Sequence, residues 1–239
     1  MSFQSIYEEI FRKNQLDAYI RPVFTEKFEK LTDIMIRQNR VMNVTALTTL
    51  EKIIPLHYAD CVKIADRIPQ NAKVLDIGCG GGFPTLPLAI VRPDLKITGL
   101  DSTEKKVRYV QSTADALHLT ISTLAGRAED FAKLPEHREN YDVVISRAVA
   151  RLNVLNELCI PFVKTGGCFL AMKGMAGMEE FEEAKAGMEK LGGSCVEATA
   201  YTLATTEETE TRTLLVIQKQ QATPSQYPRA FGAMKKNPL

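Results

Sequence analysis

Histidine and cysteine are scarce in this chain, and their spacing does not suit a metal site. Its 239 residues include three histidines and five cysteines, and no histidine lies near a cysteine at the spacing of zinc ligands. The cysteines are odd in number and spread from Cys61 to Cys195, which argues against a disulfide framework. We therefore predict reduced thiols, as is usual in the cytoplasm, and no bound metal.

Long apolar runs are also missing. No window approaches the roughly eighteen consecutive apolar residues of a spanning helix, so no membrane contact is expected. The first residues lack the basic start and apolar core of a secretory signal, and we expect a cytoplasmic protein. The 30 basic and 29 acidic side chains give a net charge of +1, which neither requires nor excludes a nucleic-acid partner.

The sequence pattern changes near residue 72. Before it, apolar positions recur at helical spacing, with Pro22 near the first turn of one predicted helix. After it, short runs rich in Val, Ile and Leu alternate with helical stretches, which predicts βαβ units and a parallel sheet. The predicted strands lie at 73–77, 96–100, 120–125, 141–145, 168–172, 194–202 and 212–219, the last two pairing antiparallel. The predicted helices among them lie at 84–91, 103–117, 151–159 and 176–190.

Charge is segregated near the C-terminus. Residues 179–210 hold nine Glu and two Lys, whereas residues 211–239 hold five basic side chains and no acidic one. A solvated tail explains such a run, and so does a tail that contacts phosphates. We divide the chain into a helical extension packed on the main domain (1–70), the main domain (71–220) and a basic tail (221–239).

The strongest local signal is a glycine-rich turn after the first predicted strand. Residues 76–84 read DIGCGGGFP. Glycine lets the backbone turn sharply and lets a ligand approach it, and open parallel sheets bind ligands at the carboxyl ends of strands. A purely structural turn is the alternative. Phe83 stands where a dinucleotide-binding G-x-G-x-x-G needs glycine, and no Walker loop is present, so S-adenosylmethionine is the favoured ligand.

Two further strand ends support a nucleoside site. Asp101 ends the second predicted strand, where a carboxylate can accept hydrogen bonds from both ribose hydroxyls of S-adenosylmethionine or of NAD. The same carboxylate could instead cap the following helix. The third predicted strand is followed by residues 126–129, GRAE, where a backbone amide and a carboxylate could bind the edge of adenine.

Together these segments resemble one enzyme family. The run 74–84 (VLDIGCGGGFP), the GRAE segment and residues 146–148 (SRA) look like the ribosomal RNA small subunit methyltransferase G family, which methylates guanine N7 in 16S ribosomal RNA. The likeness covers nearly the whole chain in the right order. Four more segments carry it: 42–46 (MNVTA), 172–174 (MKG), 227–229 (YPR) and 235–239 (KKNPL).

The resemblance implies a class I, Rossmann-like methyltransferase fold, with a mostly parallel seven-stranded sheet and an N-terminal helical extension. It implies S-adenosylmethionine as donor and 16S ribosomal RNA or the small ribosomal subunit as partner, and we expect a monomer. The implied donor contacts are Gly78, Gly80, Phe83, Asp101, Ala128, Glu129 and Arg147. The implied catalytic residues beside the target base are Asn43, Arg147 and Lys173. The implied RNA contacts are Arg127, Arg229, Lys235 and Lys236.

Two positions depart from the family pattern. Thr85 stands where the family usually has glycine, which bears on the packing of the helix after the glycine loop. The tail reads Ala230-Phe231-Gly232 after Arg229 and is less basic than usual, which bears on the strength of the RNA contact. Neither departure removes the predicted donor site.

The residues after the fourth predicted strand bear on the acceptor atom. Enzymes that methylate exocyclic base amines resemble one another in an Asn/Asp-Pro-Pro-aromatic run there, whereas this chain has Ser146-Arg147-Ala148. Methylation of pyrimidine C5 needs a cysteine nucleophile, and Cys159 lies in an apolar helix where a packed thiol is expected. Guanine N7 has an in-plane lone pair and carries no proton, so it needs no general base, and catalysis would be largely positioning.

Other functions stay open on the sequence alone. A small-molecule methyltransferase would share the donor site, and a non-catalytic RNA-binding module would keep a vestigial one. A nicotinamide dehydrogenase is disfavoured by Phe83 and by the lack of a candidate acid at a hydride site. The acceptor-side residues also have ordinary structural explanations: a surface ion pair for Arg147, a helix cap for Asn43 and a solvated cation for Lys173.

Overall fold

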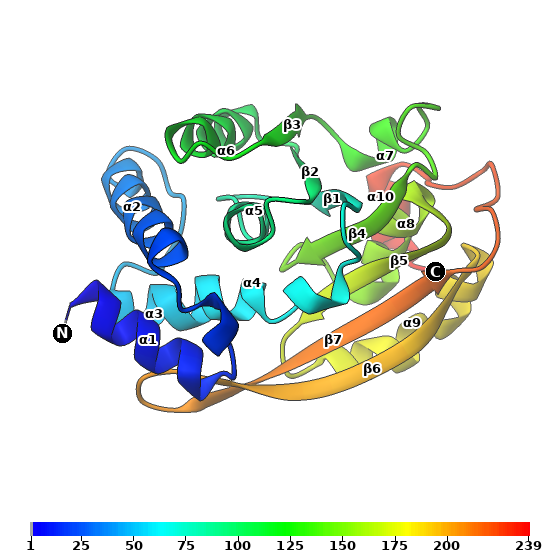
Figure 1. Ribbon diagram of the computed structural model, residues 1–239. Coiled ribbons are helices and arrows are strands. Elements are labelled where there is room, and N and C mark those ends of the chain that lie inside the picture. The colour runs from blue at the N-terminus through cyan, green and yellow to red at the C-terminus, as the bar shows by residue number, and fades with distance from the viewer. Residues whose placement is uncertain (1) are drawn as a thin grey trace.

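Seven strands form one sheet in the order β3-β2-β1-β4-β5-β7-β6 (Figure 1). The first five in that order run parallel, and β7 is antiparallel to both β5 and β6. This computed structural model describes residues 2–239. The strands are β1 (Lys73–Ile77), β2 (Lys96–Asp101), β3 (Ile121–Ala125), β4 (Tyr141–Arg147), β5 (Val163–Lys173), β6 (Gly193–Ala204) and β7 (Thr209–Lys219). The predicted class I architecture is confirmed.

Helices cover both faces of the sheet, because each parallel strand carries apolar side chains on its two sides. In β1, Val74 belongs to the core under the N-terminal helices, whereas Leu75 belongs to the core under the C-terminal ones. One layer contains α1 (Phe3–Lys13), α2 (Pro22–Asn39), α3 (Leu50–Ile53), α4 (Asp60–Val62), α5 (Thr85–Val91) and α6 (Glu104–Ala116). The other contains α7 (Ala128–Phe131), α8 (Leu152–Cys159), α9 (Gly177–Lys190) and α10 (Phe231–Lys236).

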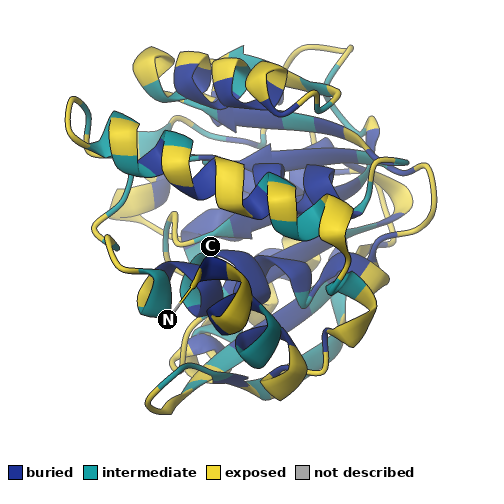
Figure 2. Cartoon of the chain, turned by 60° about the vertical axis from the view of Figure 1, so that its left-hand side comes forward, coloured by how far each residue is buried: buried dark blue, intermediate teal, exposed yellow. Residues whose placement is uncertain are grey.

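The helices turn their buried residues toward the sheet and their exposed residues outward (Figure 2). In the N-terminal segment, an aromatic cluster joins the first two helices: Phe28 of α2 lies beside Tyr7 and Phe11 of α1, with ring centroids 5.6 and 6.0 Å apart. All three rings are fully buried. Pro22 is the first residue of α2, as predicted. The N–H that proline lacks would have no hydrogen-bond partner within the helix at this position. None of the helices in residues 2–239 has both the length and the apolar character to cross a bilayer.

The largest differences from the sequence prediction lie in β5, in the hairpin of β6 and β7, and in the tail. Strand β5 begins at Val163 rather than 168, because Val163 pairs with Tyr141 of β4 before a register shift, whereas the exposed residues 164–166 that follow it have no apolar pattern. The hairpin of β6 and β7 is longer than predicted, reaching Ala204 and restarting at Thr209. The basic tail contains α10, a helix that its polar composition did not predict.

Candidate active site

The glycine loop after β1 is folded back against the neighbouring strand. The backbone N–H groups of Gly78 and Cys79 both donate to the carbonyl of Leu100 in β2, at 2.7 and 3.0 Å. Gly78 has φ +76°, a conformation that favours glycine, and a Cβ there would collide with Val149 in the loop after β4. The glycine at this position therefore satisfies both a turn and a close approach.

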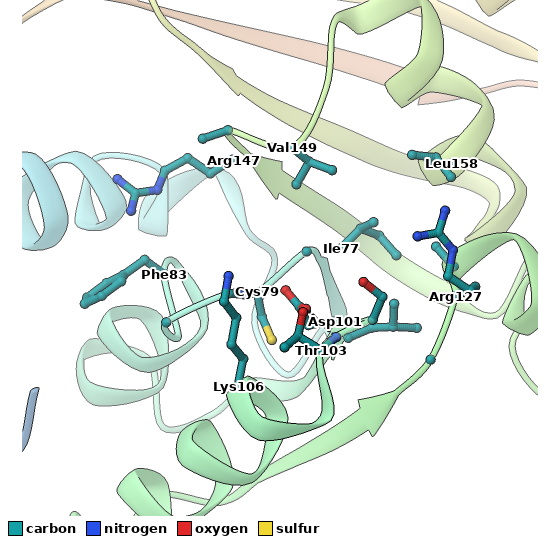
Figure 3. Close-up of a pocket in the computed structure, with 18 of the residues that line it drawn as sticks. Ile77, Cys79, Phe83, Asp101, Thr103, Lys106, Arg127, Arg147, Val149 and Leu158 are labelled. Carbon is teal, nitrogen blue, oxygen red and sulfur yellow. Dashed lines mark hydrogen bonds between the residues drawn. The ribbon is translucent and has the colours of Figure 1, made fainter. Parts of the chain in front are cut away.

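A cavity of about 430 Å³ opens at the carboxyl ends of β1 to β4 (Figure 3). This volume lies in the range of small-molecule sites. Every residue predicted to contact the donor lines it: Gly78, Gly80, Phe83, Asp101, Ala128, Glu129 and Arg147. Residues that are distant in sequence are thus brought around one hollow, as the strand-end argument requires.

Asp101 is tied to the glycine loop as well as to the next helix. Its Oδ2 accepts a hydrogen bond from Gly80 N at 3.0 Å, and its Oδ1 accepts one from Thr103 N at 2.8 Å. Thr103 is the residue before α6, so the capping alternative describes part of what this carboxylate does. An ionised carboxylate has about four acceptor positions, which leaves capacity for the hydroxyls of a ribose.

The Asp76 carboxylate is buried beneath the glycine loop, and only one of its two oxygens accepts hydrogen bonds from the described residues. Its Oδ2 accepts from Thr85 N and Thr85 Oγ1, at 3.2 and 2.6 Å. Its Oδ1 has no hydrogen-bond partner among the described residues. Burial raises the pKa of Asp76 to about 6, an effect that the Thr85 hydrogen bonds only partly oppose. Thr85, the departure from the family pattern, therefore has a defined role in the start of α5.

Arg147 ends β4 on the opposite wall of the cavity and is held by the N-terminal layer. Its Nη1 donates to the carbonyl of Leu56 at 2.8 Å and to Asp60 Oδ2 at 3.2 Å. Its Nη2 donates to His57 Nδ1 at 3.1 Å. Asp60 is almost fully buried and also pairs with Arg212 at 3.4 Å.

The partners of Arg147 lie on one continuous helical stretch. Between α3 and α4 the chain forms a π-helical turn, η2 (Ile54–Ala59), and such turns are frequent at functional sites. The turn presents the Leu56 carbonyl and His57 to the end of β4, with Asp60 just after it. The sequence reasoning missed His57 and Asp60, although their spacing of three on a helix places them on one face.

His57 is held neutral and in a defined tautomer. Because arginine only donates, Nδ1 of His57 accepts from Arg147, and Nε2–H donates to Thr45 Oγ1 at 2.7 Å. Burial, with the nearby Arg147 charge, lowers the pKa of His57 to about 3. The ring also stacks on Phe83 with centroids 4.2 Å apart. His57 thus connects Thr45, in the loop before α3, with Phe83 of the donor cavity and with Arg147.

The other two residues predicted at the target base lie outside the donor cavity. Lys173, at the end of β5, donates to the carbonyl of Ala150 at 2.8 Å and pairs with Glu180 at 2.7 Å. It lines a smaller cavity of about 240 Å³ that also contains Arg147. Asn43 is exposed and lines neither cavity, although its neighbour Val44 lines the donor cavity.

The four residues predicted to bind RNA are divided between the cavity and the tail. Arg127 lines the donor cavity and pairs with Glu129 at 3.0 Å. Lys235 and Lys236 are exposed in α10. Arg229 is engaged within the molecule, in an ion pair of 2.6 Å with the buried Glu157. Their contribution to RNA binding stays a prediction.

Comparison with known proteins agrees with this geometry. The family model for rRNA small subunit methyltransferase G matches residues 24–209. The chain belongs to this family. It is 39% identical over 225 residues to ribosomal RNA small subunit methyltransferase G of Lactobacillus delbrueckii subsp. bulgaricus, covering 92% of this chain and 93% of that protein. It is 44% identical over 205 residues to the protein of that name from Clostridium botulinum, covering 84% of each.

Solved structures share the fold of this rRNA methyltransferase at low identity. TYW2 from Pyrococcus horikoshii, in complex with MeSAdo, matches with a TM-score of 0.55 and 15% identity, over 70% of this chain and 64% of that one. A branched-chain polyamine synthase variant from Thermus thermophilus, in complex with 5'-methylthioadenosine, has a TM-score of 0.58 and 12% identity, over 81% and 64%. These likenesses show the fold alone.

S-adenosylmethionine is the cofactor of this methyltransferase family member, and the residues present fit it. The cavity supplies the Asp101 carboxylate for a ribose and the Glu129 carboxylate at the next strand end. The donor brings an electrophilic methyl group, and the chain supplies orientation around it. Within residues 2–239, no three His, Cys, Asp or Glu side chains are grouped as metal ligands.

Proposed function

We propose that this enzyme transfers the methyl group of S-adenosylmethionine to N7 of a guanosine in 16S ribosomal RNA. It acts as a monomer in the cytoplasm, on the RNA or on the small ribosomal subunit. The observation that carries the proposal is the Arg147 network: a cation held against the donor cavity, with the neighbouring His57 imidazole kept neutral.

The ionisable groups around the cavity favour an acceptor that needs no activation. His57 uses both ring nitrogens in hydrogen bonds, and its low pKa makes it a poor base. Burial raises the pKa of the Cys79 thiol, so that it stays protonated and is a poor nucleophile. Cys159 is fully buried, as the sequence predicted for a packed thiol. Guanine N7 fits such a site because its lone pair is available at neutral pH.

Arg147 is the residue that we assign to positioning the acceptor or the donor. A guanidinium has five N–H groups. Three are used by Leu56, Asp60 and His57, which leaves two without a partner among the described residues. Those two can bind the O6 edge of guanine or the carboxylate of the donor. Lys173 and Asn43 are assigned to the rim on which the acceptor rests, with orientation supplying much of the rate.

The RNA is bound through phosphates by basic side chains near the cavity mouth. Arg127 and Lys106 line the cavity, and Lys235 and Lys236 are exposed nearby on α10. Guanosine N7 within a stacked duplex does not reach such a hollow, so the target base must be unstacked or splayed. Binding through phosphates weakens as the salt concentration rises, and a salt-independent complex would contradict this assignment.

Transfer of a labelled methyl group tests the proposal. The enzyme is incubated with labelled S-adenosylmethionine and either unmethylated small subunits, purified 16S RNA, or a metabolite extract, and the products are digested to nucleosides. We expect the label in 7-methylguanosine from small-subunit RNA. Label in a metabolite would support a small-molecule methyltransferase. A protein that fails to bind S-adenosylhomocysteine in calorimetry would be an RNA-binding module with a vestigial site.

A further inference from the structure

The C-terminal segment reaches the donor cavity. After β7 the chain returns to the carboxyl ends of the strands, where α10 packs on α8 (Figure 1). Phe231, the first residue of α10, lines the donor cavity together with Ala128 and Leu158. These residues surround the end of the cavity next to β3. The family resemblance implies RNA contacts for Arg229, Lys235 and Lys236 of the tail and assigns no role to Phe231.

Two anchors hold the segment in place. Just before α10, Arg229 donates three hydrogen bonds to the Glu157 carboxylate. They come from its backbone N–H, Nε and Nη2, at 2.7, 2.9 and 2.6 Å. Glu157 is fully buried in α8, so this charge requires its partner. After α10, Leu239 packs closely on Gly187 of α9. A Cβ added at Gly187 would lie 2.6 Å from the Cβ of Leu239. Met234, which lies between Arg229 and Leu239 in the sequence, is fully buried.

Two cations flank the ring of Phe231, and one of them, Arg127, lines the cavity. The Arg127 guanidinium lies 4.5 Å from the ring centroid, and Lys235 Nζ lies 5.8 Å from it. Both distances suit cation–π attraction. Arg127 is itself bonded to Glu129, the carboxylate at the end of β3, at 3.0 Å. The ring is therefore connected, through one guanidinium, to the turn that we assign to adenine.

We propose that Phe231 is a donor-binding residue whose ring closes the adenine end of the cavity, so that the C-terminal segment is part of the donor site. An aromatic ring is suited to this place because nucleobases stack on aromatic side chains whatever their hydrogen-bonding edge. Arg127 and Lys235 position the ring in addition to any contact with phosphates. The inference rests on the proposed function only in that the cavity binds S-adenosylmethionine.

Calorimetry on the full chain tests this assignment with S-adenosylhomocysteine as the probe. We expect Phe231→Ala to weaken binding by roughly 5- to 100-fold, the range of base–aromatic stacking. Phe231→Tyr keeps the ring and is expected to stay within about threefold of the natural protein. The matched control is Phe181→Ala: Phe181 in α9 also carries a cation, Lys185, 4.8 Å from its ring, but does not line the cavity. It should bind as the natural protein does.

A second readout reports on the segment itself. Hydrogen exchange of residues 229–239 is expected to slow when S-adenosylhomocysteine binds the natural protein, and to slow less in Phe231→Ala. Exchange in α5, far from the ring, checks that the variant is folded.

The outcomes separate this inference from the proposed function. If Phe231→Ala binds the probe as tightly as the natural protein, the assignment of Phe231 is wrong, while methyl transfer to RNA can still hold. If Phe231→Ala changes only the RNA concentration needed for transfer, Phe231 belongs to the RNA surface and the inference also fails. A natural protein that does not bind the probe at all overturns both.

Discussion

The two walls of the active site are built differently. The donor wall consists of short turns that follow β1, β2 and β3, and its contacts are formed largely by backbone, such as Gly80 N on Asp101 and Gly78 N on Leu100. The opposite wall, which we propose as the acceptor wall, is a network of charged side chains in which Arg147 bonds partners 87 to 91 positions earlier in the chain.

The two walls should respond differently to the loss of one side chain. A backbone cradle keeps its shape when one side chain is shortened, so substitutions there remove single contacts to the donor. A buried network with shared partners depends on every member, and removal of one cation leaves a buried acceptor unsatisfied. Substitutions should therefore separate donor binding from methyl transfer.

The largest effect is expected for Arg147→Ala. Methyl transfer should fall by roughly 10²- to 10³-fold, the cost of losing one preorganised donor, while S-adenosylhomocysteine binds within about tenfold of the natural protein. Asp60 keeps Arg212 as a partner, so the variant should fold. Steady-state kinetics and calorimetry measure the two quantities. The control is Arg151→Ala: Arg151 is an exposed arginine in the loop that follows β4, is paired with Glu183, and its variant should be near normal.

Asp101→Ala should give the opposite pattern. We expect S-adenosylhomocysteine binding to weaken by roughly 10- to 100-fold, because hydrogen bonds to a charged group contribute about 1.5–3 kcal/mol. At a saturating donor concentration, methyl transfer should recover most of its rate, since the Arg147 network is untouched. A variant with normal donor affinity would mean that Asp101 serves only the internal hydrogen bonds with Gly80 and Thr103.

Asp76 lies beneath the donor loop and should make stability depend on pH. Its folded-state pKa is raised from 3.8 to about 6, so its proton favours folding below about pH 4, and that contribution is lost as the pH rises through 6. Asp76→Asn stays neutral and should therefore gain stability relative to the natural protein between pH 4 and 7, by roughly 2–3 kcal/mol.

Urea unfolding of Asp76→Asn and of the natural protein between pH 4 and 7 measures the difference in their free energies of unfolding. Contributions from groups that both proteins contain, such as His57, cancel in this difference. A stability difference that does not change with pH would contradict the raised pKa.

The smallest effect is expected where the two walls touch. Gly78→Ala places a Cβ against Val149 and should destabilise the fold by roughly 1–2 kcal/mol more than Gly166→Ala. Gly166 has φ +85°, close to the +76° of Gly78, but a Cβ there meets nothing within 4 Å. The pair thus isolates the collision from the backbone strain. Equal thermal unfolding of the two variants would mean that Val149 moves aside freely.

The sequence predicted the donor wall better than the acceptor wall for a physical reason. The glycine loop and Asp101 lie at strand ends, and a parallel sheet brings strand ends together wherever it forms. His57 and Asp60 were missed because their role depends on a π-helical turn and on its docking against β4, which periodicity does not encode. Phe231 was missed because α10 is held by tertiary anchors, Arg229 on Glu157 above all, rather than by helical propensity.

Transfer to guanine N7 is tested in cells by mapping 7-methylguanosine in 16S ribosomal RNA. Cells that lack this protein are complemented with the natural chain, Arg147→Ala or Arg151→Ala, and methylation is read at single-nucleotide resolution. We expect one 7-methylguanosine that depends on the natural chain, returns with Arg151→Ala and is absent or strongly reduced with Arg147→Ala. A methylation pattern that is unchanged without the protein, or fully restored by Arg147→Ala, would contradict this expectation.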